Sequence, residues 1–110
     1  MSPRSHEVEW TAVARQDLAE IVAYLASQSI DAALRALDQI EEKAASLESM
    51  PHRGRILPEV ERFAVRHYRE LIIPPYRLIY RVRDDIVYVL GVFDGRRNLE
   101  DVLLGRLLSF

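Results

Sequence analysis

The chain has 110 residues, of which 49% are hydrophobic, and it carries 15 basic and 17 acidic side chains. This length allows a single domain, spanning residues 1–110, and the hydrophobic fraction is typical of a globular chain with a core, which excludes a disordered one. There is no cysteine, which excludes disulfides, thiolate metal sites and a cysteine nucleophile. The three histidines lie far apart in sequence, so no metal site is expected, and no motif calls for a cofactor.

The net charge of −2 hides an uneven distribution. Residues 1–49 carry a net charge of −5 and residues 50–110 a net charge of +3, and Lys43 is the only lysine beside 14 arginines. This balance argues against sequence-specific nucleic-acid binding by the chain alone. No apolar run is long enough for a membrane helix, and the N-terminus lacks the apolar core of a signal peptide. We therefore expect a cytoplasmic protein without a membrane partner.

The first half of the chain predicts a strand and two helices. Residues 6–10 alternate as in a strand, with Val8 and Trp10 on one face. Thr11 is placed to cap a helix over about 12–28, and Ser29 or Asp31 to cap a second one that ends near residue 50. Each helix has one apolar stripe, and the short connection makes them an antiparallel hairpin.

The second half predicts a sheet. Residues 51–64 have two prolines and a glycine and predict a loop with room for one short helical turn. Three strands follow over 65–73, 76–83 and 86–93, joined by turns short enough for an antiparallel meander. The last strand is apolar on both faces, which favours a central position. A short C-terminal helix completes an α+β domain of order β-αα-βββ-α, with the helical hairpin packed on an antiparallel sheet.

Arginines gather around the predicted strand ends. Arg77, Arg81 and Arg83 share one face of the middle strand and make it basic. The start of that strand lies beside the end of the next, which brings Arg77 near Arg96 and Arg97. Converging guanidiniums bind phosphates or partner carboxylates. With His67, Tyr68 or Tyr76 as proton carrier, metal-free RNA cleavage is chemically conceivable. The alternative is solvated or internally paired surface charge.

Five segments together resemble one known family. They are VEWTAVARQDLAEIVAYLA from Val8, the Pro51-x-x-Gly54-Arg55 turn, Arg69-Glu70-Leu71, YRLIYRV at 76–82 and VYVLGVFDGRR at 87–97. The ordered set resembles the ParE/RelE toxins of bacterial type II toxin–antitoxin modules, which are linked to growth arrest and plasmid stabilisation. The resemblance implies the toxin fold and a toxin that forms a hetero-oligomer with its antitoxin.

The two branches of this superfamily imply different activities. RelE-like members are ribosome-dependent mRNA endonucleases, and the resemblance matches their arginines to Arg77 and Arg97, with Tyr68 or His67 as helpers. The aromatic proton carrier that RelE-like tails carry is absent here, since Leu103 and Leu104 stand in its place. Lysines on the sheet are absent too. The resemblance therefore favours the ParE-like branch, which inhibits DNA gyrase by binding rather than by catalysis, although Asp94 stands where many of its members have a histidine.

The ParE-like interpretation implies two sets of contact residues. The residues expected to bind the gyrase target are Arg53, Arg55, Arg77, Arg96 and Arg97. The residues expected to bind a ParD-like antitoxin, through an acidic amphipathic segment, are Leu18, Ile21, Tyr24, Leu25, Arg69 and Tyr80.

Overall fold

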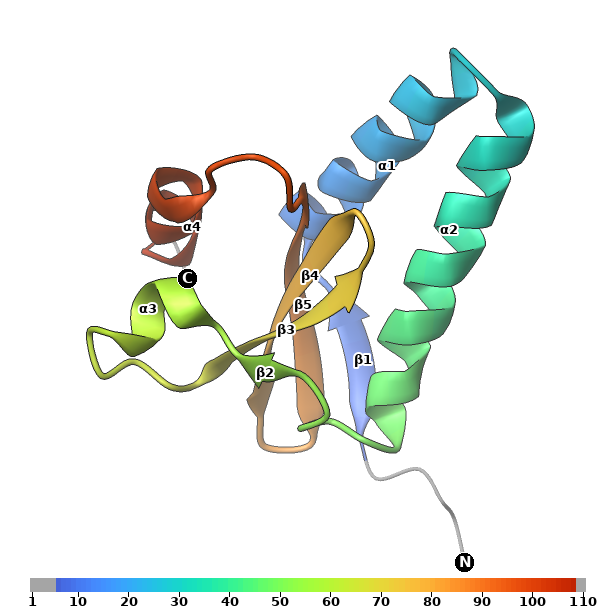
Figure 1. The fold of residues 1–110 in the computed structure, drawn as a ribbon. Coiled ribbons are helices and arrows are strands. Elements are labelled where there is room, and N and C mark those ends of the chain that lie inside the picture. The colour runs from blue at the N-terminus through green and yellow to red at the C-terminus, as the bar shows by residue number, and fades with distance from the viewer. Residues whose placement is uncertain (1–5, 109–110) are drawn as a thin grey trace, which may run out of the picture.

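The computed structural model, which describes residues 6–108, is a five-stranded sheet with helices against both faces (Figure 1). The elements are β1 (Glu7–Trp10), α1 (Ala12–Ala26), α2 (Ile30–Ala45), the 3-10 turn η1 (Ser46–Glu48), β2 (Arg55–Ile56), α3 (Pro58–Glu61), β3 (Tyr68–Ile73), β4 (Tyr76–Arg83), β5 (Ile86–Asp94) and α4 (Glu100–Leu107). The α+β class, the element order and the helical hairpin are confirmed.

The helical hairpin begins at the residues that the sequence indicates. The Thr11 hydroxyl accepts a hydrogen bond from the Ala14 amide at 3.2 Å and donates one to the Val89 carbonyl at 3.0 Å, so it caps α1 and ties it to β5. Ser29 caps α2 by accepting from the Ala32 amide. The second helix is shorter than predicted, because the chain tightens into the 3-10 turn after Ala45.

The sheet has the order β1-β5-β4-β3-β2. Strands β3, β4 and β5 form the predicted antiparallel meander, but β1 pairs in parallel with β5, so the sheet is mixed rather than purely antiparallel. Strand β3 begins at Tyr68, later than predicted, because the chain reverses at Ala64 (φ 64°) and first pairs with β4 at Tyr68 and Arg81. The region expected to be a loop holds the two-residue strand β2 and the short helix α3.

Two apolar cores lie on opposite faces of the sheet. The first lies under the hairpin and includes Ile40 and Leu47 with Leu78 and Val89. The second lies under α3 and α4 and consists of Leu57, Val60, Tyr68, Ile79, Leu90, Phe93, Leu99, Leu103 and Leu107. The predicted basic face is therefore partly covered by these two short helices. Strand β5 lies inside the sheet, between β1 and β4, and its two faces supply both cores, as expected for a strand that is apolar on both faces.

Candidate functional site

Three arginines from different elements border one hollow at the end of the sheet. Arg55 comes from β2, Arg77 from the start of β4, and Arg96 from the turn after β5. Tyr76 pairs with Asp94 across the two strands, which brings the start of β4 beside the end of β5, as the sequence predicts. The hollow has a volume of about 320 Å³.

Arg77 is held by carboxylates of its own chain. Its two terminal nitrogens donate to the two carboxylate oxygens of Glu59 at 2.7 Å each, and its Nε donates to Glu70 at 2.5 Å. Glu70 has no exposed side-chain surface and accepts a second hydrogen bond from Arg55 Nε at 2.5 Å. We call this the Glu70 network; its members are Arg55, Glu59, Glu70 and Arg77.

Within the Glu70 network, the hydrogen bonds between Arg77 and Glu59 favour the charged forms of both groups. Hydrogen bonds from Arg77 hold the pKa of Glu59 below its usual value, although burial works in the opposite direction. Hydrogen bonding to Glu59 in turn raises the pKa of Arg77, so this guanidinium keeps its charge. Only 12% of the Arg77 side chain is exposed. The arginine predicted to contact an anion is therefore a largely buried, neutralised group.

The two arginines after β5 are open to a partner. Arg96 and Arg97 are both exposed. Arg96 forms two hydrogen bonds with the Asp94 carboxylate, at 2.9 and 2.6 Å, and these lower the pKa of Asp94 to about 2. Among residues 6–108, no ion pair joins Arg97 to a carboxylate. These arginines can exchange internal or solvent contacts for acidic groups of another molecule.

Arg53 and Arg69 hold the loop before β2. Arg53 donates to the Ser46 hydroxyl at 2.8 Å, and Arg69 donates to the Gly54 carbonyl at 2.7 Å. The Gly54 amide donates to the Tyr80 hydroxyl at 2.9 Å. Tyr80 is completely buried, and burial raises the pKa of its phenol. This corrects its assignment as an antitoxin contact, because its side chain offers no surface to a partner in this structure.

The predicted antitoxin contacts of α1 lie on two sides of that helix. Ile21, Tyr24 and Leu25 line a hollow of about 430 Å³ between α1, the end of β5 and α4. We call it the α1–α4 hollow; Arg96 and Val102 also border it. Tyr24 is 66% exposed. Leu18 instead lines a separate hollow between α1 and α2.

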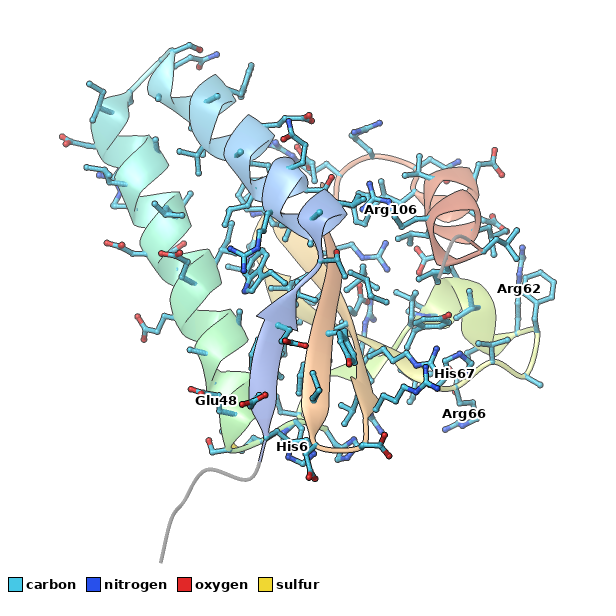
Figure 2. All side chains as sticks on the ribbon, turned by 180° about the vertical axis from the view of Figure 1, so that it is seen from behind. His6, Glu48, Arg62, Arg66, His67 and Arg106 are labelled. Atoms are coloured by element: carbon cyan, nitrogen blue, oxygen red, sulfur yellow. The ribbon has the colours of Figure 1, made fainter. Side chains whose placement is uncertain are left out.

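The structure separates the residues of the nuclease hypothesis. The ring centroids of His67 and Tyr68 lie 4.3 Å apart. His67 lies on the loop before β3 (Figure 2), and Tyr68 is the first residue of that strand. Arg77 pairs with Ile72, four residues further along β3, which is roughly 13 Å away along a strand. Burial and the charge of Arg81 lower the pKa of His67. These side chains do not converge on one scissile phosphate.

The sequence-based prediction did not identify three acidic partners of arginines, Glu59, Glu70 and Asp17. Glu70 alternates with Tyr68 and Ile72 along β3, so its pairing with Arg77 was readable once the strand register was known. Glu59 lies on α3, which the sequence predicted only as a possible turn, and no local pattern links it to β4. Asp17 and Arg106, 2.9 Å apart, come together only when α4 packs beside α1. Figure 2 shows Arg106 between these two helices.

Within residues 6–108, no group of three His, Cys, Asp or Glu side chains is placed to hold a metal ion. In that same stretch, no helix has the length and apolar character needed to cross a membrane.

Comparisons with known proteins give one matching family and one solved structure of similar fold. The family model described as ParE toxin of type II toxin–antitoxin system, parDE, matches residues 8–99. A search of curated proteins gives no match. A solved structure described as the chromosomal ParDE TA system from P. aeruginosa contains a chain with the same fold, with a TM-score of 0.68 and 23% sequence identity. The alignment covers 84% of the present chain and 98% of that chain.

Proposed function

Because the chain belongs to the ParE toxin family of type II toxin–antitoxin systems, we propose that it inhibits DNA gyrase by direct binding and is neutralised by a cognate ParD-like antitoxin. Its action then takes place in the cytoplasm, where it forms a hetero-oligomer with the antitoxin.

The state of Arg77 is the observation that carries this proposal. A nuclease of this fold would need that guanidinium free to stabilise a phosphate, yet both of its donor edges are occupied by Glu59 and Glu70. The separation of Arg77 from His67 and Tyr68 leaves the arginine without a proton carrier from that pair. Both facts favour recognition of a protein target over cleavage of RNA.

The exposed arginines at the end of the sheet form the proposed target surface. Arg55, Arg96 and Arg97 present their guanidiniums to solvent, whereas Arg77 supports the surface from beneath. Arg53, also predicted as a target contact, is exposed but lies beside Ser46, near the opposite end of the sheet. Arginines in such a patch attract carboxylates of a partner and speed its association. The target surface consists of the three exposed arginines Arg55, Arg96 and Arg97.

The α1–α4 hollow is the proposed antitoxin site. Its floor is partly apolar, and Tyr24 offers a large exposed ring at its edge. Arg96 borders both this hollow and the one at the end of the sheet. A segment seated against Tyr24 would therefore cover Arg96 as well, which gives a physical route for the antitoxin to block the target surface. Arg69, the other predicted antitoxin contact on the sheet, donates hydrogen bonds to the His52 and Gly54 carbonyls and does not line this hollow.

The experiment compares two targets with the purified toxin. Gyrase supercoiling is measured beside mRNA cleavage on translating ribosomes. We expect loss of supercoiling and intact mRNA, and cleavage with unimpaired supercoiling would overturn the proposal in favour of the RelE-like alternative. The double variant Arg96→Ala plus Arg97→Ala should weaken gyrase inhibition at least tenfold, whereas Arg35→Ala, an exposed arginine of α2, serves as the matched control.

The antitoxin site is tested separately by Tyr24→Ala. This change removes a large exposed ring from the α1–α4 hollow and leaves the arginines in place. We expect antitoxin affinity to fall about tenfold or more, as for an interface anchor, with gyrase inhibition retained. Unchanged antitoxin affinity would remove this hollow from the proposed interface.

A further inference from the structure

The second face of the sheet carries a hollow that none of the surfaces above includes. Helices α3 and α4 pack over Ile79, Leu90 and Phe93. The β4–β5 hairpin runs on past them to its turn (Figure 1). There, a hollow of about 280 Å³ lies against the sheet. Its lining includes Thr11, Arg81, Arg83, Ile86, Tyr88 and Leu90.

Strand register fixes the arrangement of its arginines. Arg81 pairs with Tyr68 on one side and Tyr88 on the other, and Arg83 pairs with Ile86. Partners across a ladder project to the same face, so two guanidiniums stand on a floor of aromatic and aliphatic side chains. The Arg81 guanidinium carbon lies 5.9 Å from the centre of the Tyr68 ring. Both arginines are thus held by a rigid sheet rather than by a loop.

Arg81 and Arg83 differ from several other arginines of the chain in their ion pairing. Within the described residues, no ion pair involves Arg81 or Arg83, whereas Arg55, Arg77 and Arg106 are each paired. The Nε atom of Arg81 is buried and has no hydrogen-bond partner. A buried N–H donor without a partner gains from an incoming oxyanion, and the exposed guanidinium of Arg83 adds a second positive charge beside it.

Acidic residues beside the hollow determine which class of anion it can bind. Glu9 of β1 pairs with Tyr88 and so lies on the same face, and Asp84 borders the hollow. This acidic rim repels a polyanion such as a nucleic-acid strand. It accepts a single carboxylate, and it favours basic groups next to that carboxylate. The apolar floor adds a preference for an aliphatic neighbour.

We propose that this hollow binds one Asp or Glu side chain of an extended segment of a protein partner. The carboxylate sits between Arg81 and Arg83, an aliphatic neighbour packs on Tyr88 and Ile86, and a following basic residue faces Glu9 and Asp84. The site shares no residue with the target surface or the α1–α4 hollow, so the two proposals stand or fall separately.

The test uses a capped heptapeptide, acetyl-Ser-Leu-Ile-Glu-Leu-Lys-Ser-amide, and its counterpart with Gln in place of Glu. Each is titrated into the full-length protein while the arginine Nε–H signals are followed by NMR. We expect the Glu peptide to shift the Arg81 and Arg83 signals in a saturable manner, and the Gln peptide to bind at least tenfold more weakly. Arg83→Gln and the double variant Arg81→Gln plus Arg83→Gln should lose this binding, and Arg35→Gln should keep it.

Three results would overturn the proposal. Equal binding of the Glu and Gln peptides would show that the arginines do not bind the carboxylate selectively. Tighter binding of inorganic phosphate or a single-stranded oligonucleotide at the same signals would make this a phosphate site. Full binding by Arg83→Gln, whose side chain is exposed and whose loss leaves the core intact, would place the peptide elsewhere.

Discussion

Glu70 is a carboxylate with no exposed surface, and two arginines hold it from opposite sides. A buried charge is tolerated only when such partners compensate for the lost water. Glu59 completes the set by taking the other edge of Arg77. Glu70 thus joins β3, on which it lies, to β2 and β4 through Arg55 and Arg77. Arg77 in turn attaches α3 through Glu59.

The pKa of Glu59 leads to a prediction on pH. Because its folded-state pKa lies below the ordinary 4.5, the ion pair contributes stability that is complete above that pH and is lost as the pH falls through the folded-state value. Glu59→Gln should therefore lower the free energy of unfolding by about 1.5–3 kcal/mol at pH 7. The difference should shrink steadily below pH 4.5.

Urea denaturation of both proteins from pH 7 to pH 3 measures this effect. Glu42→Gln, on the exposed surface of α2, is the control and should change stability by less than about 0.5 kcal/mol. A Glu59→Gln deficit that stays constant with pH would show that the ion pair is not its cause.

Gly54 is required where the loop passes close to β3 and β4. A Cβ at this position would lie 2.5 Å from the Glu70 carbonyl oxygen and 2.7 Å from the Tyr80 hydroxyl. The backbone cannot yield as a flexible side chain would, so Gly54→Ala should cost about 1–3 kcal/mol. A Cβ at Gly105 on α4 would have no such neighbour within 4 Å. Gly105→Ala should therefore raise the free energy of unfolding by about 0.5–1 kcal/mol, because alanine has the higher helix propensity. Thermal unfolding of the two variants should thus shift in opposite directions, and a neutral Gly54→Ala would contradict the close approach.

At the scale of elements, α4 is attached to the rest of the molecule by one arginine as well as by its apolar face. Arg106 donates to Asp17 of α1 at 2.9 Å and to the Leu90 carbonyl at 3.1 Å, and it lies over the Phe93 ring at 4.9 Å. Asp17 also accepts from the Val92 amide at 3.1 Å. One pair therefore fixes α1, α4 and the end of β5 relative to one another.

Arg106→Met should loosen α4 selectively. The change keeps apolar bulk and removes the charge, leaving Asp17 half-buried without its arginine, at a cost of about 1–3 kcal/mol. Amide hydrogen exchange should accelerate in α4 while α2 stays protected. Arg97→Met, which removes an exposed arginine of the preceding turn, is the control. Equal acceleration in α2 and α4 would mean that the pair stabilises the fold as a whole and not the docking of one helix.

The sequence predicted the helices and strands better than it predicted which side chains pair between them. Helices α1 and α2 and strands β4 and β5 were readable because each has a periodic apolar pattern and clear end signals such as Thr11. Strand β2 and helix α3 are too short to carry a period. The pairing of Arg77 depends on α3 and on the register with β3, so its neutralisation could not be read from spacing. The convergence of Arg77 and Arg96 needed only the β4–β5 hairpin and was therefore predictable.

At the scale of the whole molecule, β5 couples the two cores. Val89 and Leu90 are consecutive, yet Val89 packs under the hairpin and Leu90 under α4. Neither core can come apart without disturbing the strand that the other requires. We therefore expect both halves to unfold in one transition.

Matched cavities in the two cores test this coupling. Ile40→Ala and Leu103→Ala each empty a completely buried position, one per core, and should each cost about 2–5 kcal/mol. Trp10, which packs against the first core, reports through its fluorescence, and far-UV circular dichroism reports on the whole chain. In both variants the two signals should change at the same urea concentration. A Leu103→Ala protein whose fluorescence transition stays at the wild-type position would show that the cores are independent.

The parallel pairing of β1 with β5 bears on how the chain reaches this fold. Glu7 pairs with Ile86, and Thr11 bonds to Val89 across 78 positions of sequence, so the first strand has no partner until almost the whole chain has been synthesised. Contacts between such distant segments are slow to form, because the intervening chain must first be ordered. The α1–α2 hairpin can form early from local contacts, but its apolar stripe remains exposed until the sheet forms and covers it. We therefore expect sheet closure to come late in folding, and nascent or truncated chains that lack β5 to expose the surface that the finished protein buries.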